Sequence, residues 1–241
     1  MSWVYEIALR GEPHQGEALR KWFEDGVRAA YSGLPGLASF DLYMPDAGTS
    51  RDPYNSHSSG PLMLLMLDFA SRDDLAKAAA SGAIAAPVKD RALRSALRVT
   101  ATGEAFARRF FPVGEGTAPA PLEAPFSYVV RYHHPADDVA AFIENYLATH
   151  PVTQARLPGI RSIMCYLPLD EISASGLGHA GSDLAAANYM IGNEVVFDHI
   201  EDFNVAMESP ARHELRAHFH EFPRFAGANT HYPMTRSRLV G

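Results

Sequence analysis

The segment Phe23-Glu-Asp-Gly-Val-Arg-Ala-Ala-Tyr-Ser-Gly-Leu-Pro-Gly36 recurs, 123 positions further along, as Tyr146-Leu-Ala-Thr-His-Pro-Val-Thr-Gln-Ala-Arg-Leu-Pro-Gly159. In the same register Tyr43-Met-Pro45 matches Tyr166-Leu-Pro168. Chance rarely preserves one register over such a length, so the chain contains an internal repeat. We expect a first repeat at residues 1–113, a linker rich in Pro, Ala and Gly at 114–125, and a second repeat at 126–241.

Both repeats show the same order of periodic patterns. Residues 3–9 alternate between apolar and mixed positions, which predicts a strand with one strongly apolar face. A stripe of apolar positions at helical spacing over 139–150, opened by Asp137 and Asp138, predicts a helix that Leu-Pro-Gly ends. Two strands, a second helix and a fourth strand follow, the third strands at 62–69 and 189–197 and the fourth at 104–113 and 229–239.

This β-α-β-β-α-β order is that of a ferredoxin-like plait. A plait with both helices on one face leaves the other face of its sheet bare, and the second repeat can cover it. We therefore expect an α+β protein in which two ferredoxin-like repeats pack sheet to sheet as a pseudo-dimeric α/β barrel around a lumen.

Composition excludes several classes of protein. The 241 residues are 47% hydrophobic and 20% charged, as in ordinary globular proteins, and 21 basic against 28 acidic residues leave no basic surface for nucleic acid. No apolar run approaches the ~20 residues of a membrane span, and the first residues do not resemble a secretory signal, so we expect a cytoplasmic protein. The single cysteine, Cys165, rules out an internal disulfide and a multi-cysteine metal site.

The segment that runs from Tyr146 through His150 to Leu-Pro-Gly159 resembles the end of the first helix in EthD-like proteins of the dimeric α/β-barrel superfamily. Glu194-Val-Val-Phe-Asp-His-Ile-Glu-Asp-Phe203 is similar to their third strand and second helix. The resemblance covers both halves as a fold, and its fuller motif lies in residues 126–240. It implies the barrel fold and says little about activity, because the superfamily includes isomerases, cyclases, dehydratases, cofactor-free monooxygenases, heme enzymes and proteins of no known activity.

Comparing the repeats suggests which half carries a site. His150, Glu194 and Arg131 stand where the first repeat has Val27, Met66 and Ala8. Burying an unpaired polar group costs ~1–3 kcal/mol, so a core alone does not call for them. Strand alternation predicts that Arg131, His133, Tyr166 and Glu194 point into the lumen, near the helix end that carries His150. These five residues are the candidate catalytic set.

Each candidate also has a structural interpretation. His150 could cap its helix, and Glu194 with Arg131 could form an ion pair between strands. Tyr166 has a counterpart in the first repeat, Tyr43, which favours packing, and Cys165 is expected to be inert core. No histidine spacing suits a metal chelate, and no glycine-rich turn suits a dinucleotide, so we expect neither metal nor cofactor. Heme stays open because one histidine suffices as an axial ligand, although the Gly-x-x-Asp-Gly signature is absent.

These observations favour a cofactor-independent isomerase, cyclase or lyase that acts on a small apolar, aromatic or polyketide-like compound. His150 or His133 would move the proton, Tyr166 and Arg131 would hold an oxyanion, and Glu194 would orient a histidine. The alternatives are a cofactor-free monooxygenase and a non-catalytic binding protein of a catabolic pathway. A homodimer of the chain stays open.

Two long loops join the second and third strands of the repeats, at 46–60 and 169–187. Loops longer than ~12–15 residues are uncommon unless they are functional or disordered. The first carries Tyr54 and His57 and the second His179, so we expect each loop either to be surface slack or to cover a mouth of the lumen.

Overall fold

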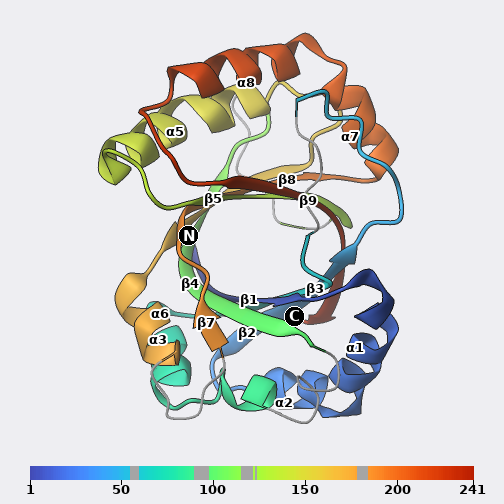
Figure 1. The fold of residues 1–241 in the computed structure, drawn as a ribbon, viewed down its shortest axis with the longest axis vertical. Coiled ribbons are helices and arrows are strands. Elements are labelled where there is room, and N and C mark those ends of the chain that lie inside the picture. The colour runs from blue at the N-terminus through green and yellow to red at the C-terminus, as the bar shows by residue number, and fades with distance from the viewer. Residues whose placement is uncertain (55–59, 90–97, 115–121, 123, 178–183) are drawn as a thin grey trace.

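In a computed structural model, eight strands close into an antiparallel barrel. The structure describes residues 1–54, 60–89, 98–114, 122, 124–177 and 184–241. The eight strands form one ring when the molecule is viewed along the barrel (Figure 1). They are β1 (Ser2–Arg10), β2 (Leu37–Pro45), β3 (Met63–Phe69), β4 (Thr100–Phe111), β5 (Phe126–His133), β6 (Ser162–Pro168), β8 (Tyr189–Phe197) and β9 (Asn229–Val240).

The order around the barrel is β4-β1-β3-β2-β9-β5-β8-β6, and β6 returns to β4. Strands β1 to β4 therefore form one half of the wall, and β5, β6, β8 and β9 form the other. The halves join at two antiparallel seams, β2 with β9 and β4 with β6. Because both seams are hydrogen-bonded, the barrel wall has no free edge along these strands.

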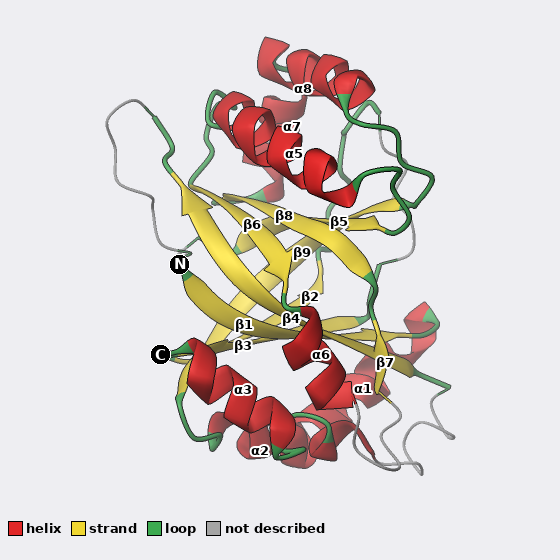
Figure 2. Ribbon diagram, turned by 90° about the vertical axis from the view of Figure 1, so that its left-hand side faces the viewer, coloured by secondary structure: helices red, strands yellow, loops and turns green. Residues whose placement is uncertain are grey.

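Helices form a layer outside each half of the barrel (Figure 2). The two halves differ in the detail of these layers. The first half has η1 (Pro13–Gln15), α1 (Gly16–Trp22), η2 (Phe23–Val27), α2 (Arg28–Ser32), α3 (Arg72–Ala80) and η3 (Ala86–Lys89). The second half has α5 (Val139–Gln154), α7 (Ile200–Met207) and α8 (Pro210–Glu221).

Local sequence fixes where these helices begin and end. The side chains of Ser71 and Asp138 accept hydrogen bonds from backbone N–H groups in the first turns of α3 and α5. Both Leu-Pro-Gly segments place their glycine, Gly36 and Gly159, at φ +77°, a conformation that disfavours side chains. At Gly36 a Cβ would also lie 2.5 Å from Cβ of Asp74, so the repeated glycine lets the chain turn into the next strand.

The apolar side chains form three clusters. Two of them lie between a helix layer and the outer face of its half of the barrel, as the alternation of residues 3–9 predicted. The third fills the lumen, and its aromatic and large apolar members include Tyr43, Leu64, Met66, Phe106, Val129, Met164, Tyr166, Tyr189, Tyr232 and Met234. Leu122 and Ala124, from the expected linker, also belong to it.

In their described parts the two long loops lie mainly against the opposite half, and Gly60 and Ala187 at their ends lie against the lumen cluster. Residues 48–54 cross to helices α7 and α8 of the second half, where Asn204 bonds the backbone of Thr49 and Arg51. The second loop contains α6 (Asp170–Leu177) and β7 (Leu184–Ala186), which pack against α3 and β4 of the first half. Each loop thus contacts the helix side of the other half. His57 and His179 lie outside the described residues.

None of the described helices has the length and apolar character that crossing a membrane would require.

Candidate functional site

Arg131 and Glu6 form an ion pair inside the barrel. Arg131 is fully buried, and its Nε and Nη2 donate to Oε2 of Glu6 at 3.0 and 2.5 Å. Its Nη1 donates to the carbonyl of Val130 at 2.8 Å, and its guanidinium lies 4.7 Å from the ring centre of Tyr166. The expected pairing of Arg131 with Glu194 is therefore wrong: the carboxylate comes from the first half, which places Glu6 on the lumen face of β1.

Glu194 is held by two tyrosines instead of an arginine. Tyr43 Oη donates to Oε1 at 3.0 Å, and Tyr166 Oη donates to Oε2 at 2.5 Å. The two tyrosines stand at matching positions of the repeats, so the halves approach Glu194 from opposite sides. Both oxygens of this fully buried carboxylate have a donor, which suits a structural role.

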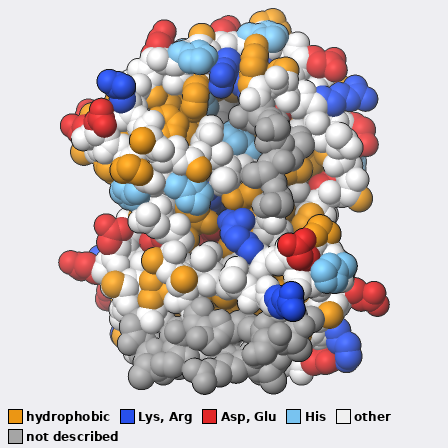
Figure 3. All heavy atoms as spheres, in the orientation of Figure 1, with side chains coloured by type: hydrophobic (Ala, Val, Ile, Leu, Met, Phe, Trp, Pro, Cys, Tyr) orange, Lys and Arg blue, Asp and Glu red, His pale blue; other side chains and the backbone are white. Residues whose placement is uncertain are grey.

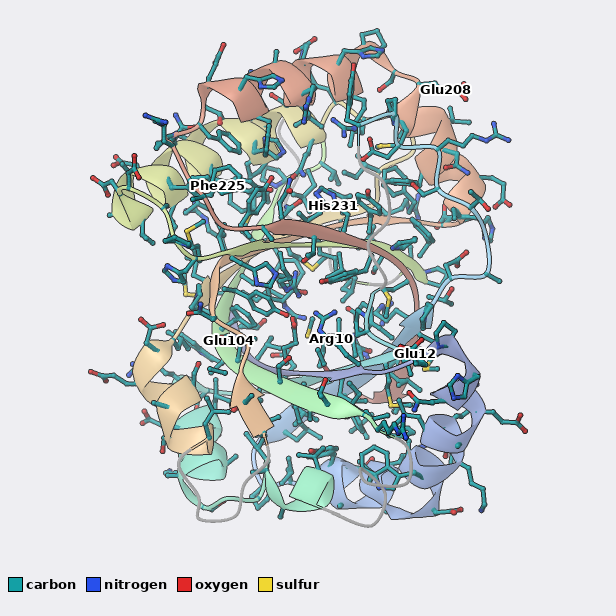
Figure 4. The ribbon with its side chains drawn as sticks, in the orientation of Figure 1. Arg10, Glu12, Glu104, Glu208, Phe225 and His231 are labelled. Carbon is teal, nitrogen blue, oxygen red and sulfur yellow. The ribbon has the colours of Figure 1, made fainter. Side chains whose placement is uncertain are left out.

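His133 lies apart from this cluster, towards one end of the barrel. It is half-buried, contacts Thr230 Oγ1 at 3.3 Å and packs edge-on against the ring of Tyr189. Burial, together with the nearby guanidinium groups of Arg10 and Arg131, lowers the pKa of His133 below its usual value. In Figure 4 Arg10 lies within the ring of strands.

Ion pairs and hydrogen bonds account for much of the polar content of the lumen. Asp41 pairs with Arg236 at 3.0 Å, and Asp68 pairs with Arg108. A lumen site was expected because a core does not need polar groups. In the structure, however, many of these groups satisfy each other, some within one half and some across the two halves. The lumen is thus a packed polar and aromatic core, and Arg131, Tyr166 and Glu194 belong to it.

His150 is on the other side of the wall. It lies on α5 and packs between the rings of Tyr146, at 4.7 Å, and Phe222, at 5.4 Å, in the space between the sheet and the helices of the second half. The expectation that it joins the other candidates in the lumen is wrong, since the apolar stripe of α5 faces its own sheet and His150 belongs to that stripe. Nor does it cap the helix, which continues to Gln154.

A pocket opens beside His150. It has about 60 Å³ of enclosed room and about 570 Å³ when the part open to solvent is included. Figure 3 shows hydrophobic and histidine side chains gathered in the upper half of this face, and Figure 4 shows His231 on the helix side of β9. The pocket has aromatic and aliphatic walls with a few polar groups among them. Its lining residues are Asp52, Tyr128, Val130, Tyr132, Tyr146, His150, Gln154, Leu157, Asn193, Val195, Phe203, Met207, Arg212, Leu215, Arg216, Phe219, Asn229 and His231.

His150 is neutral in this pocket. Burial lowers its pKa to about 3, and His218, Arg212 and His231 contribute in the same direction. Its Nδ1 is buried and finds no hydrogen-bond partner among the described residues. A buried, unpaired polar atom is costly, so Nδ1 is a candidate partner for a group bound in the pocket.

The polar side of the pocket is built by both halves. Asp52, from the first-half segment 48–54, accepts hydrogen bonds from Nε and Nη2 of Arg212 on α8, at 3.1 and 2.6 Å. Its other oxygen accepts from Tyr128 Oη at 3.2 Å. Sequence reasoning missed Asp52 and Arg212, since no periodicity connects positions 160 residues apart.

Two buried amides line the pocket beside them. Gln154 Nε2 donates to Asn193 Oδ1 at 2.7 Å, and Asn193 Nδ2 donates to Gln154 Oε1 at 3.1 Å. The repeat could have revealed both, because they replace Tyr31 and Leu65 of the first half. Cys165, next to them, is buried core as expected, and burial raises the pKa of its thiol to about 12.

The residues present do not favour a metal or a heme. The described part of the chain has no group of three or more His, Cys, Asp or Glu side chains placed to hold a metal ion. About 60 Å³ of enclosed room is far below the ~300–1,000 Å³ of pockets that take drug-sized ligands, and heme is larger than most of these. The pocket beside His150 therefore does not fit a heme.

Comparisons with known proteins support the fold assignment and do not show an activity. No family model matches the sequence, and no curated protein matches it. A proposed monooxygenase from Lactobacillus acidophilus superposes with a TM-score of 0.52 at 9% identity, over 100% of this chain and 95% of the other. An anthrone oxidase-like protein superposes with a TM-score of 0.56 at 15% identity, over 100% and 94%.

A chlorite dismutase variant from Candidatus Nitrospira defluvii gives a TM-score of 0.54 at 12% identity, over 99% of this chain and 92% of the other. All three are similar to this chain along its whole length. The fold is that of the dimeric α+β barrels.

Proposed function

We propose that the chain is a cofactor-independent enzyme that binds a small, largely apolar ring compound with one acidic hydroxyl group in the pocket beside His150. The observation that carries this proposal is the unpaired, buried Nδ1 of His150 at the edge of an aromatic pocket. A phenol or enol hydroxyl would donate to Nδ1, and the rings of Tyr146 and Phe219 would pack on the apolar part. A single ring fits into the enclosed part of the pocket only if the side chain of Met207 or Arg216 shifts. Both side chains have several rotatable bonds and can move in this way.

A pKa of about 3 makes His150 a weak base in the empty pocket. That value reflects burial without an opposite charge in contact. When a substrate hydroxyl gives its proton to Nδ1, the oxygen becomes the missing anion, and an adjacent opposite charge raises the pKa of a buried imidazole. Proton transfer is thus coupled to binding, and the resulting enolate or phenolate is the intermediate that isomerases, cyclases and lyases share.

A second candidate is a cofactor-free monooxygenase. It is favoured by the names of two proteins with this fold, a proposed monooxygenase and an anthrone oxidase-like protein. The same substrate anion would then be the species that reacts with oxygen. A non-catalytic accessory protein would bind the compound without converting it.

The finer parts of the fold assignment are also proposals. We infer that residues 1–113 and 126–241 are two ferredoxin-like repeats joined by 114–125, and that the second is EthD-like. The strand orders β4-β1-β3-β2 and β9-β5-β8-β6, which match position by position, support the repeat.

The first test uses nitrophenol, whose absorbance reports its ionisation. The bound probe should show the phenolate band at a pH below the pKa of free nitrophenol, because His150 takes its proton. His150→Gln keeps a hydrogen-bonding side chain but cannot take the proton, so its bound probe should stay neutral. If the probe bound to the wild-type protein stays neutral as well, proton transfer to His150 is refuted.

The reaction class is then separated by oxygen uptake. With hydroxylated ring compounds, turnover without oxygen consumption supports the isomerase, cyclase or lyase. Turnover with stoichiometric consumption supports the monooxygenase. Thermal stabilisation by the compound without any turnover supports the accessory protein.

A further inference from the structure

The segment that completes the pocket is firmly attached to the other half of the molecule. Asn204 on α7 bonds both the carbonyl of Thr49 and the N–H of Arg51, at 3.0 and 2.7 Å. A Cβ at Gly48 would lie 2.8 Å from the side chain of Ile200, so the backbone passes in direct contact with α7. This segment, residues 48–54, is called the strap below.

The strap delivers a carboxylate to the wall of the pocket. The side chains of Asp52 and Arg212 are 2% and 9% exposed, so their ion pair is shielded from solvent. Both Nε and Nη2 of Arg212 donate to Asp52, and these two groups form one of the edges on which a guanidinium binds a carboxylate. That edge is therefore occupied before any ligand arrives.

The remaining contacts fix this arrangement. Tyr128 Oη donates to the second oxygen of Asp52, and Tyr54 lies 4.7 Å beneath the guanidinium of Arg212. Tyr54 Oη also contacts His213 Nδ1 at 2.5 Å. The second guanidinium at the pocket, that of Arg216, lies over the rings of Tyr54 and Phe219.

From this geometry we infer that Asp52 is a specificity-determining residue that, by occupying Arg212, makes the pocket select uncharged hydroxylated rings over ring carboxylates. The inference rests on the proposed function, because it concerns the same pocket. With His150 neutral and the charge of Arg212 balanced by Asp52, an incoming carboxylate would lose its hydration without a matching unpaired cation on the buried wall of the pocket. A neutral hydroxyl carries no such cost. Arg216, the other guanidinium in the lining, lies over the rings of Tyr54 and Phe219.

The test compares single-ring probes of similar size that differ in charge: phenol and nitrobenzene as neutral probes, benzoate as the anion that nitrobenzene matches in shape, and benzamidine as the cation. Dissociation constants are measured by calorimetry on the full chain. The wild-type protein should bind phenol and nitrobenzene and exclude both ions.

Two variants should shift this preference in opposite directions. Asp52→Asn releases the charge of Arg212, so benzoate should gain about tenfold in affinity or more, while nitrobenzene changes little. Arg212→Gln removes the cation that balances the charge of Asp52, so benzamidine should gain instead. The double variant Asp52→Asn with Arg212→Gln should lose both gains.

The outcomes separate this inference from the proposed function. If neutral rings bind and neither variant shifts the charge preference, the role of Asp52 is refuted and the pocket stands. If none of the probes binds the wild-type protein, the ligand pocket is refuted, and the inference with it. Because the two variants disturb opposite partners, one of them suffices if the other fails to fold.

Discussion

At the residue scale, the two halves differ at the matching positions of His150 and Val27. Matching positions on equivalent helices hold an imidazole in one half and an apolar side chain in the other. Val27 belongs to the apolar cluster between the helices and the sheet of the first half, which also includes Ile172 and Leu184 from the loop of the second half. Only in the second half does a polar atom remain buried without a partner at an open pocket, among the residues described.

The lowered pKa of His150 makes stability depend on pH. Unfolded histidine titrates near 6.5, whereas native His150 titrates at about 3, so between these values the unfolded chain binds the extra proton. Stability is unaffected above pH 6.5 and falls as the pH drops, by about 3 kcal/mol between pH 6.5 and 4 at ~1.4 kcal/mol per pH unit. His150→Gln should remove this part of the slope in denaturant titrations.

The matched control for that measurement is His220→Gln on the exposed face of α8. It should leave the pH dependence of the unfolding free energy as in the wild-type protein. Equal slopes for the wild-type protein and His150→Gln would contradict a buried, neutral His150.

The sequence predicts which face of the sheet a side chain lies on wherever the strand alternates without interruption. It placed Arg131, Tyr166 and Glu194 on the lumen side. Alternation is interrupted at Met190, which packs on the helix side although it lies four positions before Glu194, because the register between β5 and β8 shifts between Tyr132 and His133. Partners were not predictable, because the carboxylate for Arg131 comes from a strand 125 positions away.

At the element scale, the two crossing segments have taken different roles. The strap adds a charged side chain to a pocket, whereas α6 and β7 pack against the equivalent surface of the first half. Neither α6 nor β7 was expected, because the second loop is rich in Gly, Ser and Asp. Burial of Ile172 and Leu184 explains why this composition still forms ordered structure.

Packing of α6 on the first half predicts a sensitive glycine. A Cβ at Gly176 would lie 2.6 Å from Oη of Tyr5, which is itself fully buried, so Gly176→Ala should destabilise the protein by about 1–3 kcal/mol through overpacking. Gly16→Ala, in α1, meets nothing within 4 Å and should stabilise by about 0.4–1 kcal/mol. Urea unfolding of both variants measures the difference, and equal stabilities would show that α6 is not tightly packed.

At the scale of the whole molecule, the barrel is held together by opposite charges as well as by its two seams. Among the buried lumen-facing residues in the described part of the chain, the first half contributes four acidic side chains and one arginine, and the second contributes two arginines and one glutamate. Arg131 and Arg236 both find their carboxylates, Glu6 and Asp41, in the other half. The α+β barrel was predicted from the sequence, whereas this complementarity is seen only in the closed barrel.

The charge distribution predicts how separate halves would assemble. A barrel made of two second halves would bury Arg131 and Arg236 twice, while the positions of Glu6 and Asp41 would be taken by Val129 and Met164. An unpaired buried charge costs about 3–5 kcal/mol, so such a homodimer should be unstable. Residues 1–113 and 126–241, produced separately, should instead combine one to one, as measured by light scattering after gel filtration.

Variants of one lumen pair provide the control for this assembly. Glu6→Arg in the first half should weaken reconstitution because it faces Arg131, and Arg131→Glu in the second half should restore part of it by reversing the pair. A stable homodimer of residues 126–241, or reconstitution that is indifferent to the charge at position 6, would show that the seams alone select the partner. If reconstitution instead depends on the charge at position 6, complementary lumen charges explain why each half of this barrel binds the other half in preference to a copy of itself.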